Sequence, residues 1–331
     1  MAQTWHDAYA AAAAEVDAHA VGEAVCGLAA GDLGGRRPAC AEDAEPIWAG
    51  WGPDAYRVRL ATDHPRWSGT LVARTSAPDA LARERAWVGA ARDAGFPAPE
   101  PLTDGDAATL LVFRQPAGTN LAERMISDMP ALPRLLAEFG RLHARLHQLP
   151  PDAGAAPDAP APPALDGDAT PAIVRQREWL DAHRPEPRDP VVCHGEFNPA
   201  HIVRDGDEGS GVPVNWTAAT RAEPEFDVAA TLVGFWSAAL YGNAVQRRAL
   251  KMVREPLATT YLSRYQEAAA RPLDDGRLRY WQAHHLHRLA AAIDHGLHHG
   301  ATGPWDTSAH VAIPTRSLRD VDREFRQAAG G

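Results

Sequence analysis

The sequence predicts an α+β fold with a small N-terminal part rich in strands and a larger, mostly α-helical C-terminal part. Short alternating or apolar runs that suit strands are concentrated between residues 47 and 115. Apolar residues at helical spacing recur from residue 131 to near the C-terminus. A chain of 331 residues with 45% hydrophobic content can bury a substantial core, as one bilobal domain or two small domains.

The N-terminal part is expected to begin with a helix and to continue into a sheet. Its predicted elements are a helix over 4–30, a loop over 31–45, a β pattern over 47–60, and strands over 70–74 and 109–115. Gly50 and Gly52 form a glycine-rich turn before the alternating residues of the β pattern. Such a turn lets backbone amides approach a phosphate closely, although an ordinary hairpin would have the same pattern.

The C-terminal part is expected to be helical around one polar loop. Its predicted elements are a helix over 131–149, a Pro/Ala-rich insertion over 150–171, a helix over 172–183, strands flanking a polar loop within 191–216, and helices over 228–241, 243–268, 274–299 and 315–328. The insertion has no periodicity, so we expect a loop or a semi-rigid linker there.

The polar loop is the most informative stretch of the chain. Residues 191–203 read Val-Val-Cys-His-Gly-Glu-Phe-Asn-Pro-Ala-His-Ile-Val, and residues 212–216 read Val-Pro-Val-Asn-Trp. Polar groups crowded between buried strands are costly unless they act together. We therefore expect the functional site here.

This stretch resembles the catalytic loop of the aminoglycoside phosphotransferase and choline kinase-like family. That family reads His-Gly-Asp, four spacer residues, Asn or His, and then a strand ending in Ile-Asp-Trp or Ile-Asp-Phe. The matching residues are His194, Gly195, His201 and Trp216. Two positions depart from the pattern, because Glu196 replaces the catalytic Asp and Asn215 replaces the magnesium-binding Asp.

The resemblance extends over roughly residues 45–290 and implies a bilobal protein-kinase-like fold. A small N-terminal lobe, with an antiparallel β-sheet and a helix, would comprise residues 1–115 and bind the nucleotide. A larger, mostly α-helical lobe would comprise residues 116–331 and carry the catalytic loop at 191–216 and the insertion at 150–171. The implied cofactors are ATP, or another nucleoside triphosphate, and Mg²⁺, with metal affinity weakened because an amide brings one negative charge fewer than a carboxylate.

The resemblance also implies roles for individual residues. Glu196 would orient the acceptor hydroxyl and take its proton, with His194 beside it and Asp227 anchoring the loop. Arg74 stands where the family has its phosphate-binding cation, and Glu84 where that cation has its helix partner. The implied cofactor-binding residues are Gly50, Gly52, Arg74, Glu84, Phe113 and Gln115, and the implied metal ligands are His201 and Asn215.

Histidines occur at metal-ligand spacing in two helices, but each set has a simpler interpretation. His143 and His147 lie four residues apart without a surrounding zinc motif, which favours structural or solvent-facing histidines. The segment 284–299 holds six histidines without Cys or carboxylate at matching spacing, which favours a solvated helix face over a metal site or a pH-sensitive contact.

Charge and cysteine content restrict the environment and the partners. The net charge of −10 argues against nucleic-acid or anionic-membrane partners. The three cysteines, Cys26, Cys40 and Cys193, are far apart in the sequence, and an odd number without a disulfide framework indicates a reduced cytoplasm. No basic segment precedes the N-terminal alanine run, so a signal peptide is not expected, and no apolar run is long enough to span a membrane.

Three functions are compatible with these residues. The first is an ATP-dependent O-phosphotransferase that acts on a hydroxyl of a natural product or on peptide Ser/Thr, as in family members that work with a partner lyase in lanthipeptide or thioamide-peptide dehydration. The second is a pseudokinase that acts as a scaffold or regulator. The third is a kinase-fold cleft used for another reaction or ligand.

Overall fold

The computed structural model describes residues 18–42, 44–47, 50–51, 54–103, 110–150, 162–163, 165, 167–206, 210–240, 244–299 and 317–330. The chain divides into two compact units. Unit 1 comprises Met1–Ser127, Asp152–Ala155 and Pro199–Ala218, and unit 2 comprises Asp128–Pro151, Ala156–Asn198 and Ala219–Gly331. The polar loop is therefore shared, with its first half in unit 2 and its second half in unit 1.

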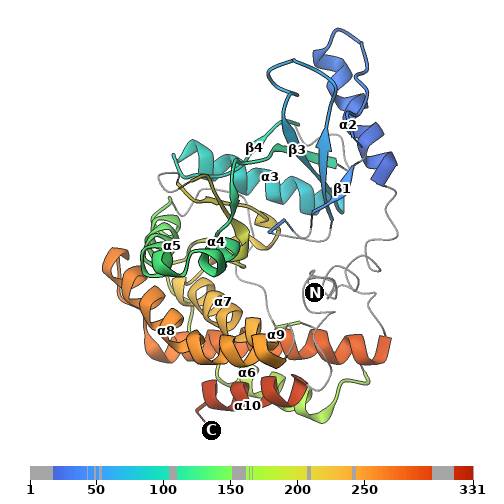
Figure 1. Cartoon of the computed structure of the whole chain (residues 1–331). Helices are drawn as coiled ribbons and strands as arrows, with labels where there is room; N and C mark the ends of the chain where they lie inside the picture. Colours follow the sequence, from blue (N-terminus) through green and yellow to red (C-terminus); the bar gives the residue numbers. More distant parts are fainter. Residues whose placement is uncertain are drawn as a thin grey trace. The chain divides into compact units, whose positions relative to one another are not determined.

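Unit 1 is built on a five-stranded antiparallel sheet in the order β1-β2-β3-β5-β4 (Figure 1). Its strands are β1 (Glu45–Pro46), β2 (Ala55–Arg59), β3 (Thr70–Thr75), β4 (Glu100–Pro101) and β5 (Leu110–Arg114). The central strand β3 pairs Arg74 with Ala55 on one side and with Leu111 on the other. The predicted strands 70–74 and 109–115 are thus confirmed as β3 and β5, with β5 ending one residue earlier than predicted and residue 109 outside the described residues.

In the described part of unit 1, two helices pack on this sheet and a second, small sheet is present. The helices are α2 (Ala18–Asp32) and α3 (Pro78–Asp93), and α2 contributes Val21 and Val25 to a core shared with Val58 and Leu71 of the strands. The small sheet has the order β6-β8-β9 and contains β6 (Thr119–Asn120), β8 (Ile202–Arg204) and β9 (Val212–Pro213), with the short helix α4 (Leu121–Ser127) beside it. The predicted helix over 4–30 is confirmed from residue 18 onward, while its first part lies outside the described residues.

The described residues of unit 2 are mostly helical, with one antiparallel strand pair, β7 (Val191–Cys193) with β10 (Thr220–Ala222). Its helices are α5 (Leu132–Leu146), α6 (Pro171–Ala182), α7 (Pro224–Ser237), α8 (Ala244–Ala268), α9 (Asp275–His299) and α10 (Leu318–Ala328). Figure 1 shows α9 as a long helix with α6 and α10 along it, and α7 packs against it as well. Among the described residues, no helix is both long and apolar enough to cross a membrane.

Three histidines in the first half of α9 contradict the sequence-based expectation of a solvated face, whereas His298 near its end is exposed as expected. The side chains of His284 and His287 are fully buried, and His285 is 7% exposed. Neighbours cover α9 on several sides, because α6, α7 and α10 all contact it. Burial lowers the pKa of His285 to about 3 and the pKa of His287 to about 4, so both rings are neutral at pH 7.

Candidate active site

In unit 1, the strand β3 places the Arg74 side chain in the interior, where it is 1% exposed. A buried guanidinium must be paired, because an isolated buried charge is very costly. Three different groups surround it. Its Nη1 donates to Oδ1 of Asn215 at 3.1 Å, its Nη2 lies 3.0 Å from Oδ1 of Asp54, and its Nε lies 3.6 Å from Oε2 of Glu84.

Glu84 of α3 links Arg74 to the segment that follows β9. Its Oε1 accepts a hydrogen bond of 3.0 Å from the backbone N–H of Trp216, while its Oε2 faces the guanidinium. Burial raises the pKa of the Glu84 carboxyl, against the lowering effect of the Arg74 charge. The structure thus brings the predicted cation, Arg74, and its predicted partner, Glu84, into one buried ion pair.

The Asn215 side chain accepts two hydrogen bonds, and these affect whether it can act as the predicted metal ligand. Its Oδ1 accepts from Arg74 Nη1 at 3.1 Å and from Thr217 Oγ1 at 3.0 Å. An amide oxygen has two lone pairs, so both are in use. The adjacent guanidinium also repels a cation. In this arrangement the Asn215 amide is not a suitable ligand for Mg²⁺, and no metal at Asn215 takes part in the reaction proposed below.

The two predicted metal ligands nevertheless lie at the same end of one hairpin. Strands β8 and β9 pair Ile202 with Pro213, and the N–H of Val214 donates to the carbonyl oxygen of His201 at 2.8 Å. Asn215 follows with φ of 64°, a left-handed conformation that asparagine tolerates better than most residues. The hairpin therefore sets the backbone of both residues, and the role of His201 as a metal ligand stays a prediction.

The glycine turn is needed for a close backbone contact. Gly50 has φ of 88°, and a Cβ at this position would lie 2.4 Å from the carbonyl oxygen of Ala200. Any side chain would collide with that backbone, so the turn packs on the segment that carries His201. Gly52, the second glycine predicted to approach phosphate, lies outside the described residues.

Phe113 lies on the interior strand β5, and Gln115 is the residue that follows the strand. Phe113 is fully buried, with its ring centroid 5.6 Å from that of Trp51, which follows Gly50. The backbone N–H of Gln115 donates to the carbonyl oxygen of Thr70 at 3.1 Å, whereas its buried side-chain Oε1 has no hydrogen-bond partner. Recognition of an adenine edge by this backbone amide would require the bond to Thr70 to open.

In unit 2, Asp227 of α7 fixes the first half of the polar loop. The backbone N–H groups of His194 and Gly195 donate to its two carboxylate oxygens at 2.7 and 2.8 Å. The carbonyl oxygen of Phe197 accepts from Thr231 Oγ1 at 2.5 Å. The backbone is therefore held on both sides of Glu196, so the position of its Cα is determined by α7.

Two imidazoles complete the surroundings of Asp227. His143 Nε2 and His147 Nε2 lie 3.1 and 3.3 Å from Asp227 Oδ2, and their Nδ1 atoms lie 2.7 and 2.6 Å from the hydroxyls of Tyr261 and Tyr265. Burial alone would raise the pKa of Asp227, but its electrostatic interactions and hydrogen bonds with the two histidines hold it well below its ordinary value. An ionised carboxylate only accepts, so both Nε2 atoms carry a hydrogen and donate to Asp227.

Among the described residues, these two histidines and Asp227 are also the one group whose ligand atoms, all within 4.8 Å of one another, could hold a metal ion. The hydrogen-bond network already satisfies every ring nitrogen and both carboxylate oxygens. Burial lowers the pKa of His143 to about 4, so the ring is neutral at pH 7. The structural interpretation of His143 and His147 therefore holds, although the rings are enclosed rather than solvent-facing.

A cation that sequence reasoning missed lies near Glu196. Burial lowers the pKa of the Arg288 guanidinium on α9, while the charge of Glu196 raises it, so the two side chains are within electrostatic reach. Other carboxylates of unit 2 are already engaged. Glu223 pairs with Arg277 at 2.5 Å, and Glu225 accepts from the N–H of Asp274 at 2.9 Å. These contacts hold both side chains within unit 2, although Glu225 Oε2 has no hydrogen-bond partner.

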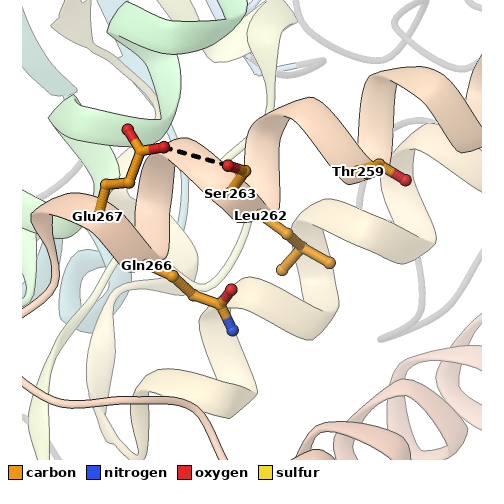
Figure 2. Close-up of a pocket in the computed structure, with 5 residues that line it drawn as sticks. All are labelled: Thr259, Leu262, Ser263, Gln266 and Glu267. Atoms are coloured by element: carbon orange, nitrogen blue, oxygen red, sulfur yellow. Dashed lines mark hydrogen bonds between the residues drawn. The ribbon is translucent and has the colours of Figure 1, made fainter.

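A surface hollow beside α8 is separate from all these residues. Figure 2 shows the residues that line it on one face of the helix, with Ser263 Oγ 3.2 Å from Glu267 Oε1. None of the residues predicted for catalysis or cofactor binding lines this hollow.

The geometry of both units matches a known family. The sequence profile of the phosphotransferase enzyme family (APH) matches residues 43–250, which is well over half of the chain. The chain belongs to this family. The match covers the glycine turn, the Arg74–Glu84 pair, the polar loop and Asp227, so the predicted family is confirmed.

Solved structures similar to this phosphotransferase-family protein confirm the kinase-like α+β fold. A candidate aminoglycoside phosphotransferase from Ralstonia eutropha JMP134 is 15% identical with a TM-score of 0.64, and the alignment covers 93% of this chain and 98% of that one. The choline kinase LicA from Streptococcus pneumoniae is 10% identical with a TM-score of 0.62, covering 93% and 98%. The amicoumacin kinase hAmiN is 11% identical with a TM-score of 0.56, covering 86% and 91%. No curated protein matches significantly.

Proposed function

We propose that this phosphotransferase-family protein transfers the γ-phosphoryl group of ATP to a hydroxyl of a small natural product or of a peptide Ser/Thr side chain. The observation that carries the proposal is the clamped loop of unit 2, in which Asp227 and Thr231 hold the backbone on both sides of Glu196. Fixed placement of a carboxylate is what a reaction that depends on positioning requires.

Two of the similar structures support this choice of donor and acceptor. The amicoumacin kinase was solved with AMP-PNP, Ca²⁺ and amicoumacin, and the aminoglycoside phosphotransferase APH(4)-Ia with ADP and hygromycin B. Both therefore hold a nucleotide and a small molecule. We infer the same two classes of ligand for this chain.

Each residue has a role in the proposed reaction. The acceptor oxygen forms a bond to the γ-phosphorus as the bond from that phosphorus to the bridging oxygen of ATP breaks. Glu196 takes the proton of the acceptor hydroxyl. Arg74, held by Glu84, supplies positive charge to the phosphates, and Asp54 has to leave the guanidinium for a phosphate oxygen to take its place.

The test is transfer of labelled phosphate from ATP to a panel of aminoglycosides, choline and Ser/Thr peptides. Glu196→Gln keeps the shape of the side chain but cannot accept the proton, so we expect the transfer rate to fall by roughly 100-fold or more. Nucleotide affinity is expected to stay within about twofold of the wild type, because the affinity change from one neutralised group outside the phosphates is small. Equal rates for the two proteins would exclude Glu196 as the base.

A second candidate function is a nucleotide-binding protein without transfer, and one observation favours it. Asn215, which stands where the family has its magnesium-binding Asp, has its amide oxygen occupied by Arg74 and Thr217. Asn215→Asp restores a carboxylate and a spare oxygen, so we expect about a tenfold gain in Mg²⁺-dependent ATP affinity.

The measurement is a thermal-shift titration with ATP, with and without Mg²⁺. Asn215→Ala is the control, because it removes the accepting oxygen and adds no charge, whereas Asn215→Asp keeps an acceptor and adds a charge. A gain in Asn215→Asp but not in Asn215→Ala supports a dormant metal position. No ATP-dependent shift in any of the three proteins would count against both candidate functions.

A further inference from the structure

Two cysteines that are distant in the sequence meet in unit 1. Cys26 lies on α2 and Cys40 lies in the segment between α2 and β1, and their Sγ atoms are 3.2 Å apart. Both are free thiols in this structure. A disulfide bond is about 2.05 Å long, so a movement of roughly 1 Å would join them.

The surrounding backbone holds both sulfurs in place. Cys26 is fully buried on α2, and Gly22 lies one turn before it on the same face. A Cβ at Gly22 would lie 2.9 Å from the Cys40 sulfur, so the glycine leaves the space that this sulfur occupies.

Cys40 is attached to the sheet through its backbone neighbours. It forms an isolated β-bridge with Leu60, and the N–H of Ala41 donates to the carbonyl oxygen of Arg59 at 2.8 Å. The two thiols therefore belong to two packed parts of unit 1, the helix α2 and the end of strand β2, and their approach does not depend on a free loop.

We propose that Cys26 and Cys40 form a site of reversible thiol oxidation, which a low-molecular-weight disulfide such as oxidised glutathione converts into an intramolecular disulfide. The difference between the two thiols sets the order of events. Cys40 is partly exposed, whereas Cys26 is buried. Burial raises the pKa of the Cys26 thiol to about 12, and the neighbouring Cys40 adds to the shift. Cys40 is therefore the thiol that reacts first, because the thiolate is the nucleophile.

The thiol–disulfide exchange proceeds in two steps, in which atoms and electrons balance. The Cys40 thiolate attacks one sulfur of oxidised glutathione, and a glutathione thiolate leaves, which gives a mixed disulfide on Cys40. Cys26 then loses its proton and attacks Cys40 Sγ, and the second glutathione thiolate leaves. Overall, two protein thiols are oxidised to one disulfide and one molecule of oxidised glutathione is reduced to two of glutathione.

The product would connect α2 covalently to the sheet. The third cysteine, Cys193, lies in unit 2, where it is fully buried and burial raises the pKa of its thiol well above the ordinary value. It therefore serves as an internal control. A disulfide that closes a short loop constrains the unfolded chain, so we expect the melting temperature of unit 1 to rise by roughly 5 °C on oxidation.

The experiment treats the full chain with oxidised glutathione over a range of concentrations, followed by peptide mapping under non-reducing conditions. The wild type and Cys193→Ser are expected to give a peptide pair linked through positions 26 and 40, and the link is expected to disappear on reduction with dithiothreitol. Cys26→Ser is expected to stop at a stable glutathione adduct on Cys40, and Cys40→Ser to give neither product.

The outcomes that overturn the proposal are equally distinct. One is a wild type that accumulates the Cys40 adduct and never the linked peptide. Another is a wild type whose cysteines all remain free at glutathione concentrations that oxidise a small dithiol peptide. Both outcomes are read from the wild type, so neither depends on the folding of a variant.

Discussion

Asp227 in unit 2 and Arg74 in unit 1 are both buried charges, and their partners differ in kind. Asp227 is surrounded by two loop amides and two imidazoles that two tyrosine hydroxyls orient in turn. Arg74 is surrounded by side-chain oxygens from a turn, a helix and a hairpin. The partners of Asp227 are backbone or enclosed rings, whereas Asp54, one partner of Arg74, is 27% exposed and can move into solvent.

The difference indicates that the Asp227 cluster and the Arg74 cluster have different roles. The Asp227 cluster holds the loop that carries Glu196 in one conformation, so its role is to keep this loop rigid. Under the proposed function, phosphate oxygens of a nucleotide would replace one of the protein oxygens around Arg74, and the partly exposed Asp54 is the partner that would leave. Three changes should separate these two behaviours. They are a lower pH, neutralisation of Asp227 and neutralisation of Asp54.

Acid should produce the largest effect, and it should act on unit 2. Burial lowers the pKa values of His143 and His287 to about 4 and of His285 to about 3, against an ordinary 6.5. The unfolded chain binds these protons below pH 6.5 and the folded unit does not, so each histidine costs about 1.4 kcal/mol of stability per pH unit between pH 6.5 and 4. We expect unit 2 to unfold within this window.

Unit 1 should respond in the opposite sense at its buried carboxyl. The pKa of Glu84 is raised, so its contribution to stability grows as the pH falls through that pKa rather than being lost. Hydrogen–deuterium exchange measured by peptide from pH 7 to pH 4 separates the two units. Loss of protection in β3 before α5 and α7 would contradict the assignment.

Asp227→Asn should produce the next largest effect. The amide keeps one acceptor but turns an N–H₂ group toward the donors that surround it, and buried donors without acceptors cost about 1–3 kcal/mol each. We expect unit 2 to lose about 3–5 kcal/mol in urea unfolding. Asp181→Asn is the matched control, because Asp181 forms an exposed pair with Arg177 on α6 and should cost no more than about 0.5 kcal/mol. Equal losses for both variants would show that the network around Asp227 does not stabilise the loop.

Local patterns in the sequence predict most of the helices and strands. Alternation from Tyr56 to Arg59 marks β2, and helical spacing marks α5 and α8 to within about three residues. The family resemblance also indicates Asp227 as the residue that anchors the loop, and the N–H groups of His194 and Gly195 donate to its carboxylate.

Long-range partners could not be predicted in the same way. Arg74 and Asn215 are 141 residues apart in the sequence, and no local pattern indicates which oxygen accepts from a guanidinium. Asp54 has the appearance of an ordinary turn residue. The burial of His284 and its neighbours depends on three other helices that cover α9, and the approach of Cys26 to Cys40 depends on how α2 lies on the sheet.

ATP titration calorimetry on the wild type and Asp54→Asn tests the central claim, that the Arg74 cluster is a nucleotide site with one exchangeable partner. Removing the carboxylate removes both the competitor and its repulsion of phosphate, so we expect wild-type binding and about tenfold tighter binding by Asp54→Asn, or about 1.4 kcal/mol. Asp63→Asn makes the same charge change at an exposed position of unit 1 and should leave affinity unchanged. No binding by either protein, or weaker binding by Asp54→Asn, would contradict the account.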